Sequence, residues 1–202
     1  MLLTYLMNKK NICFSGKGDI DIFLNNLKKF EINKKRLKID NRLSTEVKKI
    51  DILNNVNPSR FFHIDGGHDY ETVLNDIKLA TEVTLDEGII AIDDVFRPEW
   101  PEVSMAVFQS EELEKRNFAC FAIGFNKSYY CNKKYFNKYQ EILLKNKSLT
   151  RFLEKKYISK KYKVLIFQDY PLPEWNYKQI IWWFLKTYIP NFYLNLKKFL
   201  KK

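Results

Sequence analysis

The sequence predicts an α/β fold built on a parallel β-sheet, and two observations carry this prediction. Two apolar segments, at residues 60–65 and 88–94, each end in aspartate and enclose a stretch with helical spacing of its apolar residues. A strand, a helix and a second strand within about thirty residues form a right-handed parallel crossover. The length of 202 residues, of which 46% are hydrophobic, suffices for a domain with a substantial core.

The region before the crossover is predicted to alternate between strands and helices. We expect a strand at Ile12–Ser15 and a second short strand at residues 36–40. Between them the apolar residues recur at intervals of three and four, which is the spacing of one helix face: Ile20, Phe23, Leu24, Leu27 and Phe30. A polar helix is expected to follow and to end before Asn57 and Pro58.

The central crossover has the most regular pattern. Its first strand, at 60–65, is almost continuously apolar, which suits a sheet covered on both faces. The helix is predicted over 70–85, with Asp69 as its N-cap and Gly88 in the place of a C-cap. Two further strands, FACFAIGF and KSYYC, flank Asn126 and predict a hairpin.

Residues 133–202 are predicted to form a mostly helical extension of a domain at 1–132. Within the extension, the Lys- and Tyr-rich segment 134–162 is expected to be helical, and KVLIF to add a strand. After Trp175, bulky aromatic residues are mixed with lysines. This last segment suits an interfacial helix with peripheral membrane contact. Pro190 interrupts it, which favours packing on its own domain or on a second copy in a homo-oligomer.

The composition argues against several classes of function. The net charge of +11 comes mostly from dispersed lysines, arginine is scarce and no base-reading motif is present, so no nucleic-acid partner is predicted. Cys13, Cys120 and Cys131 form no CxxC pair, so we expect reduced thiols rather than a disulfide framework or a zinc site. The sequence lacks the pattern of a signal peptide or a membrane span, which predicts a cytoplasmic location.

Three carboxylates are predicted to meet at one edge of the sheet. Asp65 ends the first strand of the crossover, and Asp93 with Asp94 ends the second. Ligands of open parallel sheets bind beyond the carboxyl ends of the strands. An all-oxygen set of this kind suits Mg²⁺ or Ca²⁺ rather than zinc. Single acids could be helix caps or turn residues, but three adjacent negative charges repel one another unless a cation relieves them.

The two histidines are expected to have different roles. His68 follows Asp65 by three residues, so it lies within reach of whatever Asp65 binds. An imidazole there can take a proton from a hydroxyl that a metal has acidified. His63 lies inside the strand and is interpreted as a residue of the core or of the other face. Gly66 and Gly67 allow the backbone to turn sharply and to approach a ligand closely.

The segment HIDGGHDYETVLNDIKLATEVTLDEGIIAIDDV, residues 63–95, resembles the class I S-adenosylmethionine-dependent methyltransferases of the macrocin O-methyltransferase and cephalosporin-hydroxylase-like group. Their signature is a strand ending in I-D-G-x-H-x-Y, a helix that carries an aspartate, and a strand that ends in two acids. The positions that match are Asp65, Gly66, His68, Tyr70, Asp76, Leu85, Gly88, Asp93 and Asp94. The resemblance covers about residues 11–132 and implies a Rossmann-like methyltransferase sheet.

This resemblance also implies the chemistry of the site. By analogy with the metal-dependent members of the group, Asp65, Asp93 and Asp94 would bind Mg²⁺. His68 would be the general base that deprotonates a hydroxyl of a sugar or another small acceptor. The reaction implied is O-methylation with S-adenosylmethionine as the methyl donor.

The cofactor contacts implied by the resemblance are Asp65 and, near the adenine side, Asp40 and Ser44. In the family, a first strand and a Gly-rich loop that holds the methionine end of the cofactor stand well before the helix at 19–30. Only Gly16 and Gly18 imitate that loop here, and they lead directly into this helix. The domain is therefore expected to be N-terminally truncated.

Two other functions are compatible with parts of the sequence. The first is an inactive, truncated methyltransferase-like domain that acts as an interaction module through its basic, aromatic tail. The second is a metal phosphohydrolase, suggested by the pair His68 and Asp69. It is disfavoured because such sites need several histidines and this chain has two.

Overall fold

The computed structural model describes residues 3–5, 20–29, 37–40, 42–124, 126–150, 152–157, 163–167 and 176–199. The chain divides into two compact units, Met1–Phe167 and Gln168–Lys202, each described by itself below. The division predicted after residue 132 marks where the family resemblance ends, and it stays a prediction.

The N-terminal part of the first unit contains two short paired strands and three helical segments. The helix predicted over 19–30, the strand predicted at 36–40 and the polar helix before Asn57 are all confirmed. The strand expected at Ile12–Ser15 lies outside the described residues. An unpredicted strand near the start of the chain pairs in parallel with the strand that ends at Asp40. The elements are β1 (Leu3–Tyr5), α1 (Ile20–Lys29), β2 (Lys38–Asp40), η2 (Ser44–Glu46) and α2 (Lys49–Asn55).

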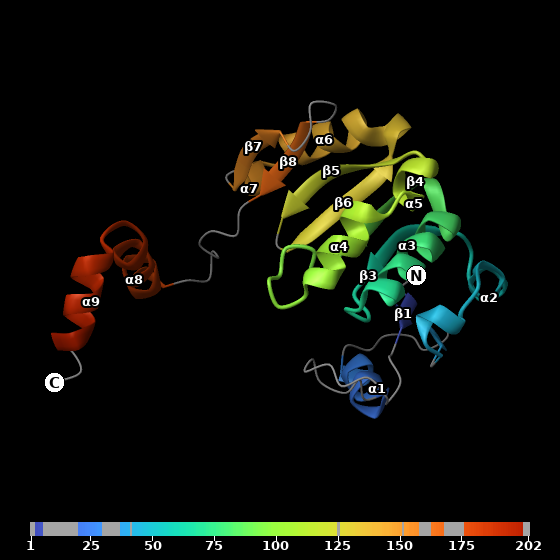
Figure 1. Cartoon of the computed structure of the whole chain (residues 1–202), viewed down its shortest axis with the longest axis horizontal. Helices are drawn as coiled ribbons and strands as arrows, with labels where there is room; N and C mark the ends of the chain where they lie inside the picture. The colour runs from blue at the N-terminus through green and yellow to red at the C-terminus, as the bar shows by residue number, and fades with distance from the viewer. Residues whose placement is uncertain are drawn as a thin grey trace. The chain divides into compact units, whose positions relative to one another are not determined.

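A mixed sheet of six strands forms the centre of the first unit (Figure 1), with the order β3-β4-β6-β5-β8-β7. Strands β3 and β4 are parallel and joined by helix α3, which confirms the predicted crossover. Strands β5 and β6 are antiparallel, which confirms the predicted hairpin, and Asn126 takes a positive φ of 68° in its turn. The strands are β3 (Ser59–Ile64), β4 (Thr84–Ile92), β5 (Phe118–Gly124), β6 (Lys127–Asn132), β7 (Leu153–Tyr157) and β8 (Lys163–Phe167).

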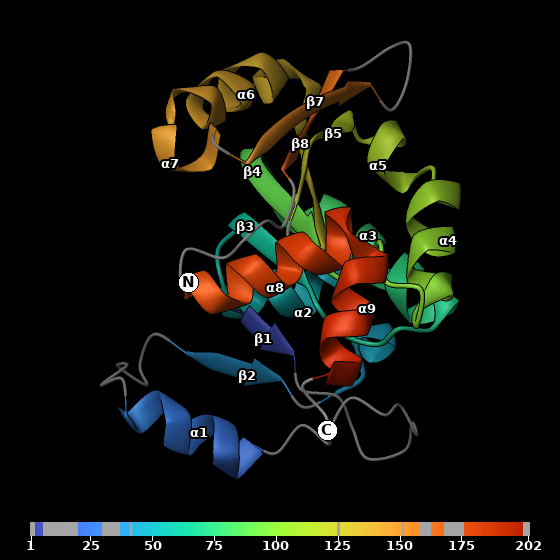
Figure 2. The ribbon, with the colours of Figure 1, turned by 90° about the vertical axis from the view of Figure 1, so that its left-hand side faces the viewer.

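Helices cover both faces of this sheet. Figure 2 shows α4 and α5 on one side and α6 and α7 on the other. The larger core lies under α3 and contains Ile77, Ile90 and Ile92, all with 0% exposure. The smaller core lies under α6 and contains Phe121, Cys131 and Leu165. The helical segments are α3 (Tyr70–Val83), α4 (Pro101–Gln109), α5 (Glu112–Lys115), η3 (Lys133–Tyr135), α6 (Phe136–Lys145) and α7 (Lys147–Thr150). The α/β fold class is thus confirmed.

Three details differ from the sequence prediction. Helix α3 ends at Val83, and Gly88 lies inside β4 instead of capping the helix. A Cβ at Gly88 would lie 2.9 Å from the carbonyl oxygen of Leu85, so close packing explains this glycine. Residues 153–157 form β7 rather than helix. Strand β3 is an edge strand of the described sheet, and Phe61 on its second face is 49% exposed, so that face is not fully covered.

The cysteines that the structure describes are free thiols. Cys120 and Cys131 lie on neighbouring strands β5 and β6, and neither is in a disulfide. Burial raises the pKa of both thiols to about 12, so neither is activated as a nucleophile. Cys13 lies outside the described residues.

The second unit consists of two helices, α8 (Tyr177–Tyr188) and α9 (Pro190–Phe199). Asn176 and Gln179 form a reciprocal capping box at the start of α8. Pro190 is the first residue of α9, so the predicted interruption is confirmed. In the part of the chain that the structure describes, every helix is too short or too polar to cross a membrane.

Candidate functional site

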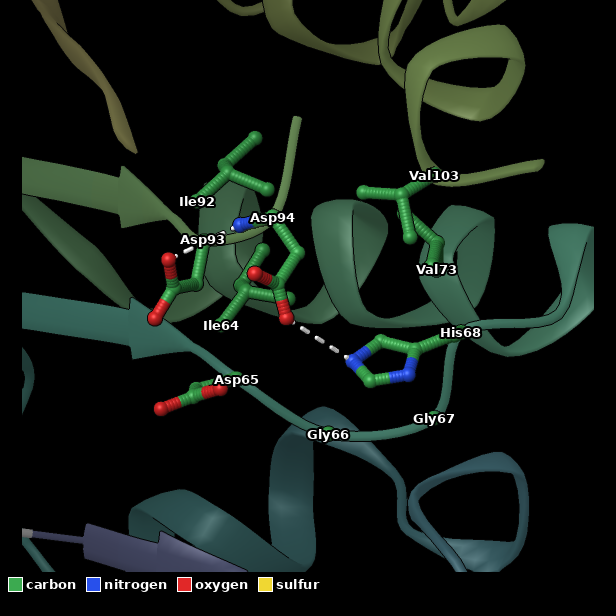
Figure 3. A pocket seen from close by; sticks show the side chains of 10 residues that line it. All are labelled: Ile64, Asp65, Gly66, Gly67, His68, Val73, Ile92, Asp93, Asp94 and Val103. Atoms are coloured by element: carbon green, nitrogen blue, oxygen red, sulfur yellow. Dashed lines mark hydrogen bonds and ion pairs between the residues drawn. The ribbon is translucent and has the colours of Figure 1, made fainter. Parts of the chain in front are cut away.

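A pocket lies beyond the carboxyl ends of β3 and β4, where the sequence predicted the site. Asp65 directly follows β3, and Asp93 directly follows β4. The backbone amide of Asp93 donates to the carbonyl of Ile64 at 2.9 Å, which holds the two strand ends together. Figure 3 shows the residues that line the pocket: Ile64, Asp65, Gly66, Gly67, His68, Val73, Ile92, Asp93, Asp94 and Val103.

Three possible metal ligands gather on one side of these strand ends. A nitrogen of His63 and carboxylate oxygens of Asp65 and Asp93 all lie within 4.8 Å of one another. Side chains two residues apart on a strand point to the same face, which brings His63 and Asp65 together. The Nε2 atom of His63 is buried, has no hydrogen-bond partner among the described residues and lies 3.9 Å from Oδ2 of Asp93. The sequence interpretation gave His63 no role in the site, although its spacing from Asp65 was a usable signal.

Asp94 is turned away from this group. Its φ of 56° is in the left-handed region, which bends the chain at the end of β4. Oδ2 of Asp94 lies 3.1 Å from Nε2 of His68 (Figure 3), and Oδ1 lies 3.2 Å from Nε of Arg97. The side-chain amide of Asn126 donates to the same Oδ1 at 2.5 Å. Of the three acids predicted to share one metal, Asp65 and Asp93 are therefore adjacent to His63, and Asp94 pairs with His68.

Basic side chains of the chain itself offset part of the negative charge. Lys127, at the start of β6, forms an ion pair with Asp93, and Arg97 pairs with Asp94. Ile92 pairs with Ser128 in the register of β4 and β6, so the next positions, Asp93 and Lys127, come face to face. Asp65 is exposed to solvent. Asp93 and Asp94 are thus stabilised by cations before any metal is considered.

His68 lies on the side of the pocket opposite Asp65 and Asp93 (Figure 3). Its side chain is 11% exposed, and its ring lies against Trp100 with 4.3 Å between ring centroids. Nδ1 is buried and has no hydrogen-bond partner within the described ranges. The contact with Asp94 places the proton of a neutral imidazole on Nε2. The orientation of this ring is therefore determined by Asp94 and Trp100.

Beneath the glycine turn lies a buried acid, Asp76 of α3. A Cβ at Gly66 would lie 3.2 Å from Oδ2 of Asp76, so the turn approaches this carboxyl closely. Burial raises the pKa of Asp76 to about 6, and the side chains of Ser44 and Asn75 partly offset that rise. Neither Gly66 nor Gly67 has a positive φ. Close packing, rather than a left-handed turn, accounts for Gly66.

The two remaining predicted cofactor contacts do not line the pocket. Asp40, at the end of β2, accepts from Nη2 of Arg42 at 2.6 Å, and this hydrogen bond lowers its pKa. Arg42 also pairs with Asp51 at 3.1 Å. Ser44 begins η2, and its carbonyl accepts from the side chain of Asn75 at 2.8 Å, which ties the η2 turn to α3. The roles of Asp40 and Ser44 toward a cofactor stay predictions.

Comparison with known proteins supports the motif assignment. Residues 27–95 match a family model described as a methyltransferase domain. A search of curated proteins gave no match. Among solved structures, the apo form of CalS11, a TDP-rhamnose 3'-O-methyltransferase of calicheamicin biosynthesis, is 16% identical over 57% of this chain and 53% of that chain, with a TM-score of 0.41.

A second solved structure gives a similar result. The precorrin-6y C5,15-methyltransferase of Geobacter metallireducens GS-15 is 18% identical over 55% of this chain and 58% of that chain, with a TM-score of 0.34. The chain thus spans little more than half the length of either protein, and neither likeness determines its fold or activity. The family match, by contrast, contains the Asp65 turn and the acid pair Asp93 and Asp94. The resemblance to class I S-adenosylmethionine-dependent methyltransferases is therefore confirmed, and residues 27–95 carry the methyltransferase-domain pattern of that family.

Proposed function

We propose that this protein is an S-adenosylmethionine-dependent methyltransferase that methylates a hydroxyl of a sugar or another small acceptor with help from a divalent cation. The observation that carries the proposal is the pairing of Asp65 with Asp93 at the ends of two parallel strands, inside the segment that matches the methyltransferase family. Ligands of open parallel sheets bind at this edge. The small-molecule acceptor follows from the family resemblance.

The donor set fits a divalent cation. Asp65 and Asp93 offer carboxylate oxygens, and the ion pair of Asp93 with Lys127 indicates that this position attracts positive charge. Asp65 and Asp93 would hold the ion, with His63 or Asp94 as the third protein ligand. A bound Mg²⁺ would lower the pKa of an acceptor hydroxyl. A nitrogen ligand such as His63 would widen the choice to Mn²⁺ or other transition metals.

His68 is the residue that we propose as the general base. Its Nε2 faces the acids, where it now meets Asp94 at 3.1 Å. For proton transfer, the acceptor hydroxyl would take the place of the Asp94 carboxylate at Nε2, and the neutral imidazole would change to the tautomer that carries its proton on Nδ1, which leaves Nε2 able to accept the proton of the hydroxyl. Trp100 would keep the ring in place and reduce the access of water. The methyl group would come from the positively charged sulfur of S-adenosylmethionine.

We predict that the purified chain binds S-adenosylmethionine saturably, with micromolar affinity, in calorimetric titrations made with and without Mg²⁺. Asp65→Asn should weaken the effect of Mg²⁺, because it removes one negative oxygen from the donor set. Asp86→Asn, at an exposed position of β4, is the matched control and should behave as the wild type. Absence of cofactor binding under both conditions would eliminate the enzyme and favour the alternative below.

A second prediction identifies the third metal ligand. His63 and His68 are the only histidines in the chain, so Mn²⁺ bound to untagged protein reports imidazole coordination without ambiguity. Pulsed electron paramagnetic resonance should detect nitrogen coupling that persists in His68→Ala and disappears in His63→Ala. Mn²⁺ affinity should fall at least about tenfold in His63→Ala. Nitrogen coupling that is retained in His63→Ala would point to His68 as the ligand. Absence of nitrogen coupling in the wild type, together with a larger loss of affinity in Asp94→Asn, would assign the third position to Asp94.

The alternative is an inactive methyltransferase-like domain that acts as an interaction module. Its support is that Lys127, Arg97 and Asn126 already pair with Asp93 and Asp94, two of the three acids at the strand ends. These two acids would therefore need no metal for their charge to be balanced. Under this alternative, neither Mg²⁺ nor S-adenosylmethionine gives a binding signal, while the protein remains folded by circular dichroism.

A further inference from the structure

Helix α8 presents an apolar face to solvent. The exposed residues Tyr177, Ile181 and Tyr188 have exposed fractions of 69%, 54% and 63%. They form one stripe with Ile180 and Phe184, because residues three, four and seven positions apart share a face of a helix. Five large apolar or aromatic side chains therefore lie on one side of a helix of 12 residues.

Two more exposed apolar residues follow the stripe in the sequence. Ile189, which links α8 to α9, and Phe192, in the first turn of α9, are 45% and 53% exposed. Another set of aromatic rings holds the two helices together: Trp182 meets Tyr193 edge to face, with 5.6 Å between ring centroids. The helix pair thus has aromatic contacts of its own, in addition to the exposed stripe. An exposed apolar surface of this extent marks a site of interaction.

The charged side chains of residues 175–202 are all positive. Residues 175–202 contain six lysines and no aspartate or glutamate. Lys178 on α8 and Lys197 on α9 are exposed. Because the segment has no acidic side chain, the negative charge that balances these lysines comes from outside it. Two copies meeting through this segment would bring like charges together, which opposes self-association.

We propose that the pair α8 and α9 is a membrane-surface binding element that lies in the interface of an anionic lipid bilayer. Aromatic and aliphatic residues on one face with lysines beside them are the composition of interfacial helices. The anionic headgroups supply the missing negative charge. Helices of 12 and 10 residues are too short to span a bilayer, which takes about 20 residues, so the pair would lie parallel to the surface.

This inference is independent of the methyltransferase proposal, since it depends only on residues of the second unit. The full-length chain would be mixed with phosphatidylcholine vesicles, with and without phosphatidylglycerol, and recovered by flotation. Three of the four tryptophans, at 175, 182 and 183, lie in this segment, so the emission of the whole protein reports its environment. Flotation with phosphatidylglycerol vesicles, and a blue shift of tryptophan emission, are expected at low salt.

Variants separate the apolar and the electrostatic contributions. Ile181→Asp combined with Phe184→Asp should weaken vesicle binding at least tenfold, and Lys178→Gln combined with Lys197→Gln should weaken it while leaving the apolar face intact. Phe108→Asp replaces a phenylalanine of α4 in the first unit that is 64% exposed, against 48% for Phe184, and should bind vesicles as the wild type does. High salt should weaken binding, because surface attraction to anionic lipid is screened.

The proposal is overturned if the wild-type chain does not float with phosphatidylglycerol vesicles at low salt. It is also overturned if the chain is a dimer without lipid that Ile181→Asp with Phe184→Asp converts to a monomer, since the occupant of the apolar face is then a second copy. Equal binding to vesicles with and without phosphatidylglycerol would contradict the role of the lysines. Circular dichroism of each variant shows whether the helices remain formed.

Discussion

Replacing His68 with alanine is expected to lower the rate of methyl transfer by roughly 10²- to 10⁴-fold and to leave the affinity for S-adenosylmethionine unchanged. Among the described residues that line the pocket, the imidazole is the only group apart from the carboxylates that can accept a proton. Removing it leaves only carboxylates, which are weaker bases than an imidazole, to accept the proton of the hydroxyl. Cofactor binding should persist because the polar and ring contacts of His68 in the described structure are with Asp94 and Trp100, which are not among the predicted cofactor residues Asp40, Ser44 and Asp65.

The contact between His68 and Asp94 allows a second role, in which the imidazole only positions the carboxylate. His68→Gln distinguishes the two roles, since its side-chain amide can donate to Asp94 but cannot take a proton from a hydroxyl. As a base, His68 should not be replaceable by glutamine, and added imidazole should partly restore the alanine variant. The measurement is release of S-adenosylhomocysteine with a panel of sugars and small hydroxylated acceptors. Turnover by His68→Gln close to that of the wild type would remove His68 as the base.

Local patterns in the sequence were sufficient to predict the crossover and the hairpin. The apolar spacing from Val73 to Val83 depends only on helix geometry, and Asp69 accepts from the amide of Thr72 at 3.0 Å, as its capping role requires. The turn at Asn126 between β5 and β6 could likewise be predicted from the local sequence. Each of these features is determined by residues within one helix or one turn, so no tertiary information was needed.

Features that depend on contacts distant in sequence were missed. Gly88 has the place of a helix cap in the sequence, but the structure explains it by the carbonyl groups of Leu85 and Ser59, one of them on the neighbouring strand. Strand β7 pairs antiparallel with β8, and that partner decides its conformation more than its lysine-rich composition does. A strand whose conformation depends on pairing with another strand cannot be predicted from its own residues alone.

The candidate site was predictable only where it follows from the crossover of β3, α3 and β4. Neighbouring parallel strands bring Asp65 beside Asp93, and this followed from the crossover. The side chain of Asp94 points away from that of Asp93 because the backbone of Asp94 is left-handed, and the sequence pattern does not predict this conformation. Lys127 meets Asp93 because β6 pairs antiparallel with β4, a register that only the assembled sheet defines.

The second large effect is expected at Asp76: Asp76→Asn should stabilise the protein above neutral pH. Burial raises the pKa of Asp76 from 3.8 to about 6, because the charged carboxylate loses water that the hydrogen bonds of Ser44 and Asn75 replace only in part. Its Oδ1 has no hydrogen-bond partner in the described structure. An asparagine of the same shape avoids this cost, since it carries no charge.

The sign of the pH dependence follows from the direction of the shift. The folded state holds the proton of Asp76 more tightly than the unfolded chain does, so wild-type stability falls as the pH rises from about 4 to about 6 and then stays low. A difference of about 2 pKa units corresponds to about 3 kcal/mol. The advantage of Asp76→Asn in the free energy of unfolding should therefore be near zero at pH 4 and approach this value at pH 8.

Urea unfolding of both proteins between pH 4 and pH 8 measures this difference directly, and subtraction of the two curves removes the contribution of every other titrating group. Asp86→Asn, which removes an exposed charge, should follow the wild type at all pH values. An advantage that is independent of pH would show that Asp76 is not the group responsible. Asp76 also lies against Gly66, at the turn that leads to His68. If Asp76→Asn is more stable but no longer binds the cofactor, the buried carboxylate serves the site and lowers the stability of the protein.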